Sequence, residues 1–277
     1  MDLLNARVVL FSIMILCLTH ALAGGRGNGA MAQTSYKETE VPNGGSIRGT
    51  VRFVGVVPQL VQLPISKDDK VCGKKKASPR LVVGKNQGVA NTIIYLEGIT
   101  SGKRFPDSST VTMNQYKCEY SPHILLVPPR SILEIVNSDK VLHNVHTYDV
   151  GAQMKTVFNI AQPIVGQRTV VKQKPKNNRG LAFATCDAGH PWMSAYVMYM
   201  DNPYCTLTDS NGNFTLEDIP PGSYTLKMWH EGVSITRTEM ERESVKKYTY
   251  EEPYESIQEI TILPGQSKTV TFEFSLR

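Results

Sequence analysis

The sequence predicts an all-β protein made of antiparallel sandwiches. Short runs rich in Val, Ile, Thr and Tyr recur about every ten residues, and turn-forming residues separate them. No long stretch carries the period of an amphipathic helix. With 41% hydrophobic and 20% charged residues, the 277-residue chain has the composition of a globular protein with a real core.

The predicted strands are short and bounded by turns. Asn-Gly, Pro-Pro and Pro-Gly pairs mark these turns at 43–45, 128–129, 209–212 and 220–222, because such residues supply the required backbone dihedrals. In chain order the clearest strands are 46–54, 92–96, 124–127, 132–136, 181–185, 214–216 and 269–274. Alternation predicts that Phe214, Leu216, Tyr224 and Leu226 point inward.

The first residues predict export. An apolar run at 8–18 follows Arg7, and the Ala-Leu-Ala sequence at 21–23 fits a cleavage site, so residues 1–23 are expected to be a signal peptide. A retained membrane anchor is the alternative, although the run is shorter than the roughly 20 residues a spanning helix needs. Residues 24–43 have the composition of a flexible lead-in. The expected location is periplasmic or extracellular, with no membrane span after cleavage.

The charge pattern argues against a nucleic-acid partner. The net charge is only +5, and no basic stripe interleaved with aromatic residues accompanies it. The densest basic run, 172–179, is expected to be a solvated loop, with a docking patch for an acidic redox partner as the alternative. The acidic stretch 237–259 is expected to be a solvated hairpin or loop.

Two separated parts of the chain resemble a prealbumin-like sandwich, the module also known as the carboxypeptidase regulatory-like domain. The resemblance is carried by GSIRGTVRFVGVVP at 45–58, NTIIYLEG at 91–98, TLTDSNGNFTLEDIPPGSYTLKM at 206–228 and KTVTFEFSL at 268–276. It implies that residues 44–101 and 203–277 form one domain. Residues 102–202 would then be a second sandwich inserted at a surface loop. Two sequential domains are the alternative.

The inserted segment resembles the cupredoxins, or blue copper proteins, and amicyanin in particular. The motifs are HNVH at 143–146 and CDAGHPWM at 186–193. Over residues 45–235 the chain is similar to secreted cupredoxins nested in a regulatory-like module, some of them labelled methylamine-utilisation proteins. The resemblance implies a Greek-key sandwich that binds one type-1-like copper ion. This loop has three residues between Cys186 and His190, whereas amicyanin-like loops have two, and Gly189 can absorb the extra residue.

The residue types support the same metal without the resemblance. One thiolate, two imidazoles and one thioether form a soft set suited to copper in both oxidation states. We therefore predict four metal ligands: His143, Cys186, His190 and Met193.

Three further residues are expected to support this site. Asn144 should bond the backbone near Thr185 or Asp187, and Asn137 should brace the turn before His143. His146 is expected beside the ligands or at a surface electron exit. His123 and His230 are expected to be structural.

Four cysteines remain after cleavage, and an exported protein can form disulfides. Cys72 and Cys118 are the plausible disulfide, because Cys186 is assigned to the metal and Cys205 has no obvious partner.

These features predict an electron carrier rather than an enzyme. One copper ion would cycle between Cu(I) and Cu(II), and the partner would be a redox protein such as a cytochrome or a dehydrogenase. One alternative is copper binding and delivery without redox turnover. The other is a carbohydrate-binding or adhesion module without a metal.

Overall fold

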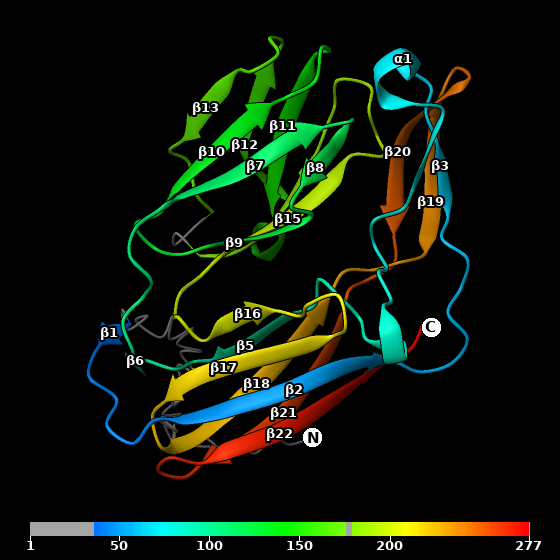
Figure 1. Cartoon of the computed structure of the whole chain (residues 1–277). Helices are drawn as coiled ribbons and strands as arrows, with labels where there is room; N and C mark the ends of the chain where they lie inside the picture. Colours follow the sequence, from blue (N-terminus) through cyan, green and yellow to red (C-terminus); the bar gives the residue numbers. More distant parts are fainter. Residues whose placement is uncertain (1–35, 176–178, 277) are drawn as a thin grey trace, which may run out of the picture. The chain divides into compact units, whose positions relative to one another are not determined.

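The computed structural model describes residues 36–175 and 179–276, and these residues form β structure almost throughout (Figure 1). Helix is limited there to α1 (Asp69–Cys72) and two short 3₁₀ turns, Lys85–Gln87 and Val150–Ala152. The predicted all-β class is confirmed. The predicted signal peptide, most of the lead-in and residues 176–178 of the basic run lie outside the described residues. Within those residues no helix is long and apolar enough to cross a membrane.

Two sheets built from the beginning and the end of the chain form what we call the outer sandwich. One sheet has the order β16-β5-β18-β21 and the other β17-β2-β22. In Figure 1 the blue β2 lies between the yellow β17 and the red β22, so early and late strands share a sheet. The strands are β2 (Gly45–Phe53), β5 (Ile93–Glu97), β16 (Cys205–Leu207), β17 (Asn213–Ile219), β18 (Gly222–His230), β21 (Tyr254–Ile262) and β22 (Ser267–Phe274).

Nine strands between β5 and β16 in the sequence form the inner sandwich. Its sheets have the orders β13-β10-β7-β8 and β12-β11-β14-β15-β9. The strands are β7 (Thr110–Tyr116), β8 (Glu119–Ser121), β9 (Ile124–Val127), β10 (Ile132–Asn137), β11 (His143–Asp149), β12 (Lys155–Gln162), β13 (Arg168–Val171), β14 (Gly180–Thr185) and β15 (Ser194–Tyr199). The sheets thus show one β-sandwich interrupting another. Residues 102–202 as the limits of a domain remain a prediction.

The two sandwiches have separate apolar cores. Inner strands supply alternating buried residues such as Met113, Ile135 and Val197 to one cluster. The outer cluster includes Phe214, Leu216 and Leu226, whereas Tyr224 is only half-buried and packs at its margin. The period-2 pattern placed four residues of β17 and β18 inward, and three of them are buried.

A small third cluster joins the sandwiches. Ile93 and Trp229 of the outer sandwich pack with Ile124 of the inner one, and Cys205 lies at the edge of this cluster. His123 shares a hydrogen bond with Glu231 beside them, and His230 is buried, in accord with structural roles for both histidines.

Three pairs of short strands lie outside the sandwiches. They are β1 (Lys37–Glu38) with β6 (Ser101–Gly102), β3 (Gln62–Pro64) with β4 (Lys75–Ala77), and β19 (Ile235–Glu241) with β20 (Ser244–Tyr250). We call residues 62–77, from β3 through α1 to β4, the strap.

The first pair corrects the expected extent of the flexible lead-in. Within residues 24–43, Lys37 and Glu38 form β1, which pairs in parallel with β6. The Tyr36 hydroxyl donates a hydrogen bond to the Lys103 carbonyl at 2.8 Å, and its ring packs on Phe105. These contacts come from a partner strand about 65 residues away, which composition alone does not reveal.

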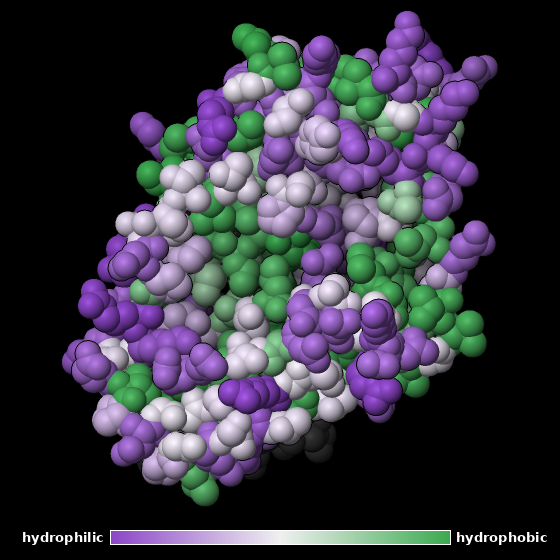
Figure 2. Space-filling model, viewed as in Figure 1, coloured by the Kyte–Doolittle hydropathy of each residue, from purple (hydrophilic) through white to green (hydrophobic). Residues whose placement is uncertain are grey.

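Residues 237–250 of the acidic stretch form the predicted hairpin, although one of its faces is not solvated, whereas residues 254–259 belong to β21 of the outer sandwich. Tyr248 is buried, and Tyr250 packs with it against the inner core. The Arg80 guanidinium lies 3.4 Å from the centroid of the Tyr250 ring. The hairpin thus contacts the inner sandwich through its aromatic residues. In Figure 2 hydrophilic residues gather on the exterior at the upper right, where Figure 1 places α1 and the β19–β20 hairpin.

Candidate metal centre

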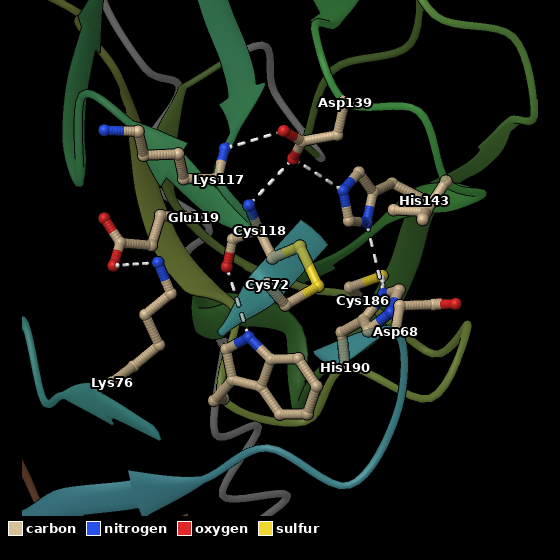
Figure 3. Close-up of a disulfide and its surroundings, with 12 residues drawn as sticks. Asp68, Cys72, Lys76, Lys117, Cys118, Glu119, Asp139, His143, Cys186 and His190 are labelled. Carbon is tan, nitrogen blue, oxygen red and sulfur yellow. Dashed lines mark hydrogen bonds and ion pairs between the residues drawn. A yellow bond between two sulfur atoms is a disulfide. The ribbon is translucent and has the colours of Figure 1, made fainter. Parts of the chain in front are cut away.

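Three predicted ligands from two neighbouring strands converge at one end of the inner sandwich. His143 begins β11, and Cys186 and His190 follow β14 in the loop that leads to β15. One potential ligand atom from each of the three lies within 4.8 Å of the others. The Nδ1 atoms of the two histidines are 3.1 Å apart, and Cys186 Sγ is 3.5 Å from His190 Nδ1. Figure 3 shows the three side chains gathered beside the disulfide.

Each imidazole is fixed from behind by a carboxylate. His143 Nε2 is 2.9 Å from Asp139 Oδ2, and His190 Nε2 is 2.9 Å from Asp68 Oδ2. Because an ionised carboxylate can only accept hydrogen bonds, each Nε2 carries the proton and donates it. Both Nδ1 atoms are therefore acceptors that face the Cys186 sulfur.

This arrangement fits a metal ion of the copper or zinc type. Two imidazole acceptors 3.1 Å apart cannot hydrogen bond to each other without an added proton, whereas a cation between them would satisfy both. Near-tetrahedral bonds of about 2.0 Å to nitrogen and about 2.3 Å to sulfur would place two nitrogens about 3.3 Å apart and nitrogen and sulfur about 3.5 Å apart. The observed spacings of 3.1 and 3.5 Å are close to these values.

The remaining predicted ligand, Met193, lies in the same buried loop. Its backbone N–H donates to the His190 carbonyl at 2.9 Å, which closes a turn between the two residues. The side chains of His143, His190, Cys186 and Met193 are 0, 0, 2 and 1% exposed. The Met193 side chain is therefore part of the inner core, in the cluster that also contains Cys186.

Trp192 supports the ligand loop through contacts with Cys118 and His190. Its indole N–H donates to the Cys118 carbonyl at 3.2 Å, and its ring meets the His190 ring edge-on with centroids 5.1 Å apart. The loop is thereby tied to the turn between β7 and β8, on the opposite sheet of the inner sandwich, through the disulfide-bonded Cys118.

Burial dominates the electrostatics of Cys186. Removal from water raises the pKa of its thiol, although backbone N–H groups of Asn144 and Ala188 oppose the change by stabilising the thiolate. Burial likewise lowers the pKa of His190. A metal ligand must be deprotonated, so metal uptake at neutral pH would displace the thiol proton.

Asn144 clamps the ligand loop next to one of its expected positions. Its Oδ1 accepts from the backbone N–H of Ala188 at 2.9 Å, while its Nδ2 donates to Asn159 at 2.8 Å. The predicted partners were backbone groups near Thr185 or Asp187. The bond goes to Ala188, the residue after Asp187, and so agrees with this prediction.

Asn137 ends β10 and braces the turn before His143, as the sequence predicts. Its Nδ2 donates to the carbonyls of Val141 and Gln162, at 2.9 and 2.8 Å, and its Oδ1 accepts from the Asp139 backbone N–H. Asn137 therefore orients the loop that carries both Asp139 and His143.

Asp139 is held as a carboxylate by several donors. Besides His143, it accepts from the backbone N–H groups of Lys117 and Cys118, each at 2.7 Å. Although burial opposes ionisation, these bonds hold the pKa of Asp139 below its usual value. Cys118 also lies within metal-ligand spacing of Asp139 and His143, but its sulfur is in a disulfide and offers no thiolate.

His146 does not join the converging ligands. Its ring contacts Asp187 and Thr156 and stacks on Tyr148 with ring centroids 4.1 Å apart. The side chain is 15% exposed. Because Asp187 follows Cys186 directly, His146 lies half-buried beside the ligand loop, and its role as a surface electron exit remains a prediction.

The disulfide of Cys72 and Cys118 attaches the strap to the inner sandwich. The two Cα atoms are 5.2 Å apart, and the residues are separated by 46 positions. This is the pair expected from the sequence. Cys186 and Cys205 are the free cysteines in the described part of the chain.

Three residues around the site were not predicted from the sequence: Asp68, Lys67 and Asp139. Lys67 Nζ donates to the Ala188 carbonyl at 2.6 Å, beside the bond from His190 to Asp68. Asp139 precedes His143 by four residues, and an acidic residue so close to a ligand histidine was an available signal. No local pattern marks Asp68, which lies 122 positions before His190.

Comparisons with known proteins match parts of the chain. Residues 179–246 match a family model described as polysaccharide lyase family 4, domain II. A solved structure titled a novel purple cupredoxin from Nitrosopumilus maritimus aligns with 23% identity over 33% of this chain and 98% of its own, with a TM-score of 0.27. A copper-containing nitrite reductase from Thermus scotoductus SA-01 aligns with 20% identity over 35% of this chain and only 23% of its own, with a TM-score of 0.26. No curated protein sequence matches this chain.

Proposed function

We propose that the protein is an exported mononuclear copper protein that carries electrons, with His143, Cys186, His190 and Met193 as its ligands. The observation that carries this proposal is the convergence of two Nδ1 atoms and one thiol on a common point, while each Nε2 is bonded to a carboxylate. Carboxylate–histidine–metal arrangements orient imidazole ligands in this way. Bound copper would supply one-electron chemistry between Cu(I) and Cu(II).

The residues around the site suit a carrier rather than an enzyme. All four proposed ligands are buried, which favours electron transfer through the protein over a reaction on a metal-bound substrate. Packed side chains and the carboxylate bonds would hold the imidazoles in place through a change of oxidation state. The disulfide supports location in an oxidising compartment, periplasmic or extracellular. The proposed partner is a redox protein such as a cytochrome or a dehydrogenase.

Copper addition to the purified mature protein tests this proposal. We expect one equivalent of Cu(II) to produce an intense thiolate-to-copper absorption band and a paramagnetic resonance signal. Cys186→Ala should abolish the band, whereas Cys205→Ala, which removes the other free cysteine, should retain it. Unchanged copper stoichiometry and absorption in Cys186→Ala would contradict the ligand assignment.

Copper binding and delivery without redox turnover is the second candidate. The chemistry of the donor set favours it, because a buried thiol, two imidazoles and a thioether are soft ligands that suit retention of Cu(I). Rapid, reversible reduction by a small mediator is expected of a carrier. Tight Cu(I) binding with slow reoxidation would favour delivery instead.

A further inference from the structure

We propose that Asp68 is a positioning residue for His190, so that the strap, which precedes the inner sandwich in the sequence, completes the candidate metal centre. This inference rests on the proposed ligand role of His190. It assigns a structural part of the centre to a segment outside residues 102–202.

The first support is the contact itself. Asp68 Oδ2 lies 2.9 Å from His190 Nε2, the ring atom opposite the proposed ligand atom. The imidazole is fully buried, while the carboxylate is 30% exposed. Asp68 therefore stands between the ring and solvent. Beside it, Lys67 Nζ bonds the Ala188 carbonyl at 2.6 Å, so the strap contacts the ligand loop at two points.

The second support is the way the strap holds Asp68 at this place. The Asp68 carbonyl accepts from the backbone N–H groups of Val71 and Cys72, each at 2.9 Å, at the start of α1. Cys72 is bonded to Cys118 of the inner sandwich, and Leu63 is buried in the inner core. A covalent link four residues away and an apolar anchor on the other side thus fix Asp68 against His190.

The physical consequence concerns the orientation of one ring. The Nε2–H bond to Asp68 keeps the ring from turning about its Cβ–Cγ bond and leaves Nδ1 unprotonated toward Cys186. Without this acceptor, water would reach Nε2 and the ring would lose its fixed orientation. His143 would keep its own support, because Asp139 belongs to the inner sandwich.

A metal-free measurement tests the contact. We would follow solvent exchange of the His190 Nε2 proton by ¹⁵N-resolved NMR at neutral pH in the full-length mature chain. Asp68 has φ of 54°, so Asp68→Gly removes the acceptor without backbone strain. We expect exchange at least about 10-fold faster in this variant, because a hydrogen bond to a charged group is lost. Asp68→Asn keeps an oxygen acceptor and tolerates this φ, so it should restore most of the protection. Asp69→Gly, at the exposed neighbouring position, is the matched control and should leave exchange unchanged.

A second measurement connects the contact to the metal. Transfer of copper from the loaded protein to a Cu(I) chelator should be about 10–100-fold faster in Asp68→Gly than in Asp69→Gly. Equal proton exchange in these two variants would overturn the inference even if copper binds as proposed. Conversely, a chain that binds no copper but loses Nε2 protection in Asp68→Gly would overturn the proposed function while leaving the positioning contact in place.

Discussion

The two imidazoles of the candidate centre have the same support from two different parts of the chain. On the His143 side, Asp139 comes from the same loop, is only 5% exposed, and is held by two backbone N–H groups. On the His190 side, Asp68 is 30% exposed and comes from the strap. One support therefore forms with the inner sandwich itself, while the other depends on whatever attaches the strap.

Two attachments of the strap explain how the distant support is held. The disulfide fixes its middle, and Arg80 fixes the chain just after β4. A ligand histidine can thus be oriented by a carboxylate close to it in the sequence or by one that long-range contacts hold beside it. The support of His143 and the support of His190 should therefore be lost under different substitutions.

Arg80→Met should have the largest effect on stability. The Arg80 guanidinium is buried, lies 2.7 Å from Glu231 Oε2, and donates to the Gly232 carbonyl at 2.9 Å. Removing it leaves the Glu231 carboxylate buried without its main cation, and we expect a loss of about 3–5 kcal/mol in the free energy of unfolding. Denaturant titration measures this loss. Arg168→Met, which breaks an exposed pair with Glu134, should lose far less. Similar losses of stability in the two variants would show that Arg80 does not anchor the strap.

Loss of the disulfide should come next. Replacing Cys72 and Cys118 together by Ser frees a loop of 46 positions, for which chain entropy gives about 4 kcal/mol, while measured losses are often about 2–4. Calorimetry under identical buffer conditions measures it, with Cys205→Ser as the control. This variant should still bind copper, because the support of His143 by Asp139 does not depend on the disulfide. Complete loss of copper binding in a folded double variant would contradict that separation.

The sequence predicted the parts of the site that lie close together along the chain. Cys186, His190 and Met193 fall within one loop, so their spacing was readable as a ligand pattern. The turn residues and alternating apolar residues predicted the strands well, and 124–127 coincides with β9. The disulfide followed from assigning Cys186 to the metal, which left few possible pairs.

The parts that were missed depend on long-range contacts. Asp68 meets His190 only after β3, α1 and β4 have packed on the inner sandwich, and no periodic pattern in 62–77 reports that packing. The acidic hairpin was predicted to be solvated because of its glutamates, but Tyr248 and Tyr250 bury one of its faces. A composition-based reading averages over such faces. It therefore predicts solvation where one side of a strand pair is in fact covered.

Asp139→Asn should have an intermediate effect and should act on the other side of the comparison. An amide has one acceptor oxygen and cannot satisfy His143 and the N–H groups of Lys117 and Cys118 as the carboxylate does. We expect a loss of about 1–3 kcal/mol in stability and a copper affinity weaker by about 10–100-fold. Thermal unfolding and competition with a chelator measure these two quantities. Asp107→Asn, at an exposed position, is the control. If Asp139→Asn weakens copper binding no more than Asp68→Asn does, the local support has no advantage over the distant one.

Gly189→Ala should have the smallest effect and reports on the contact between the loop and the strap. Gly189 has φ of +92°, so an L side chain is strained there by about 1–2 kcal/mol. A Cβ would also lie 2.8 Å from Lys67 Cδ, which can move because it belongs to a flexible side chain. Gly166→Ala is the matched control, since it has φ of +80° and nothing within 4 Å of its added Cβ. Unfolding of the two variants should differ by less than about 1 kcal/mol. Most of that difference should vanish when Lys67 is also changed to Ala, because the side chain that the new Cβ displaces is then gone. A difference that survives Lys67→Ala would show that the loop is constrained by its own backbone and not by the strap.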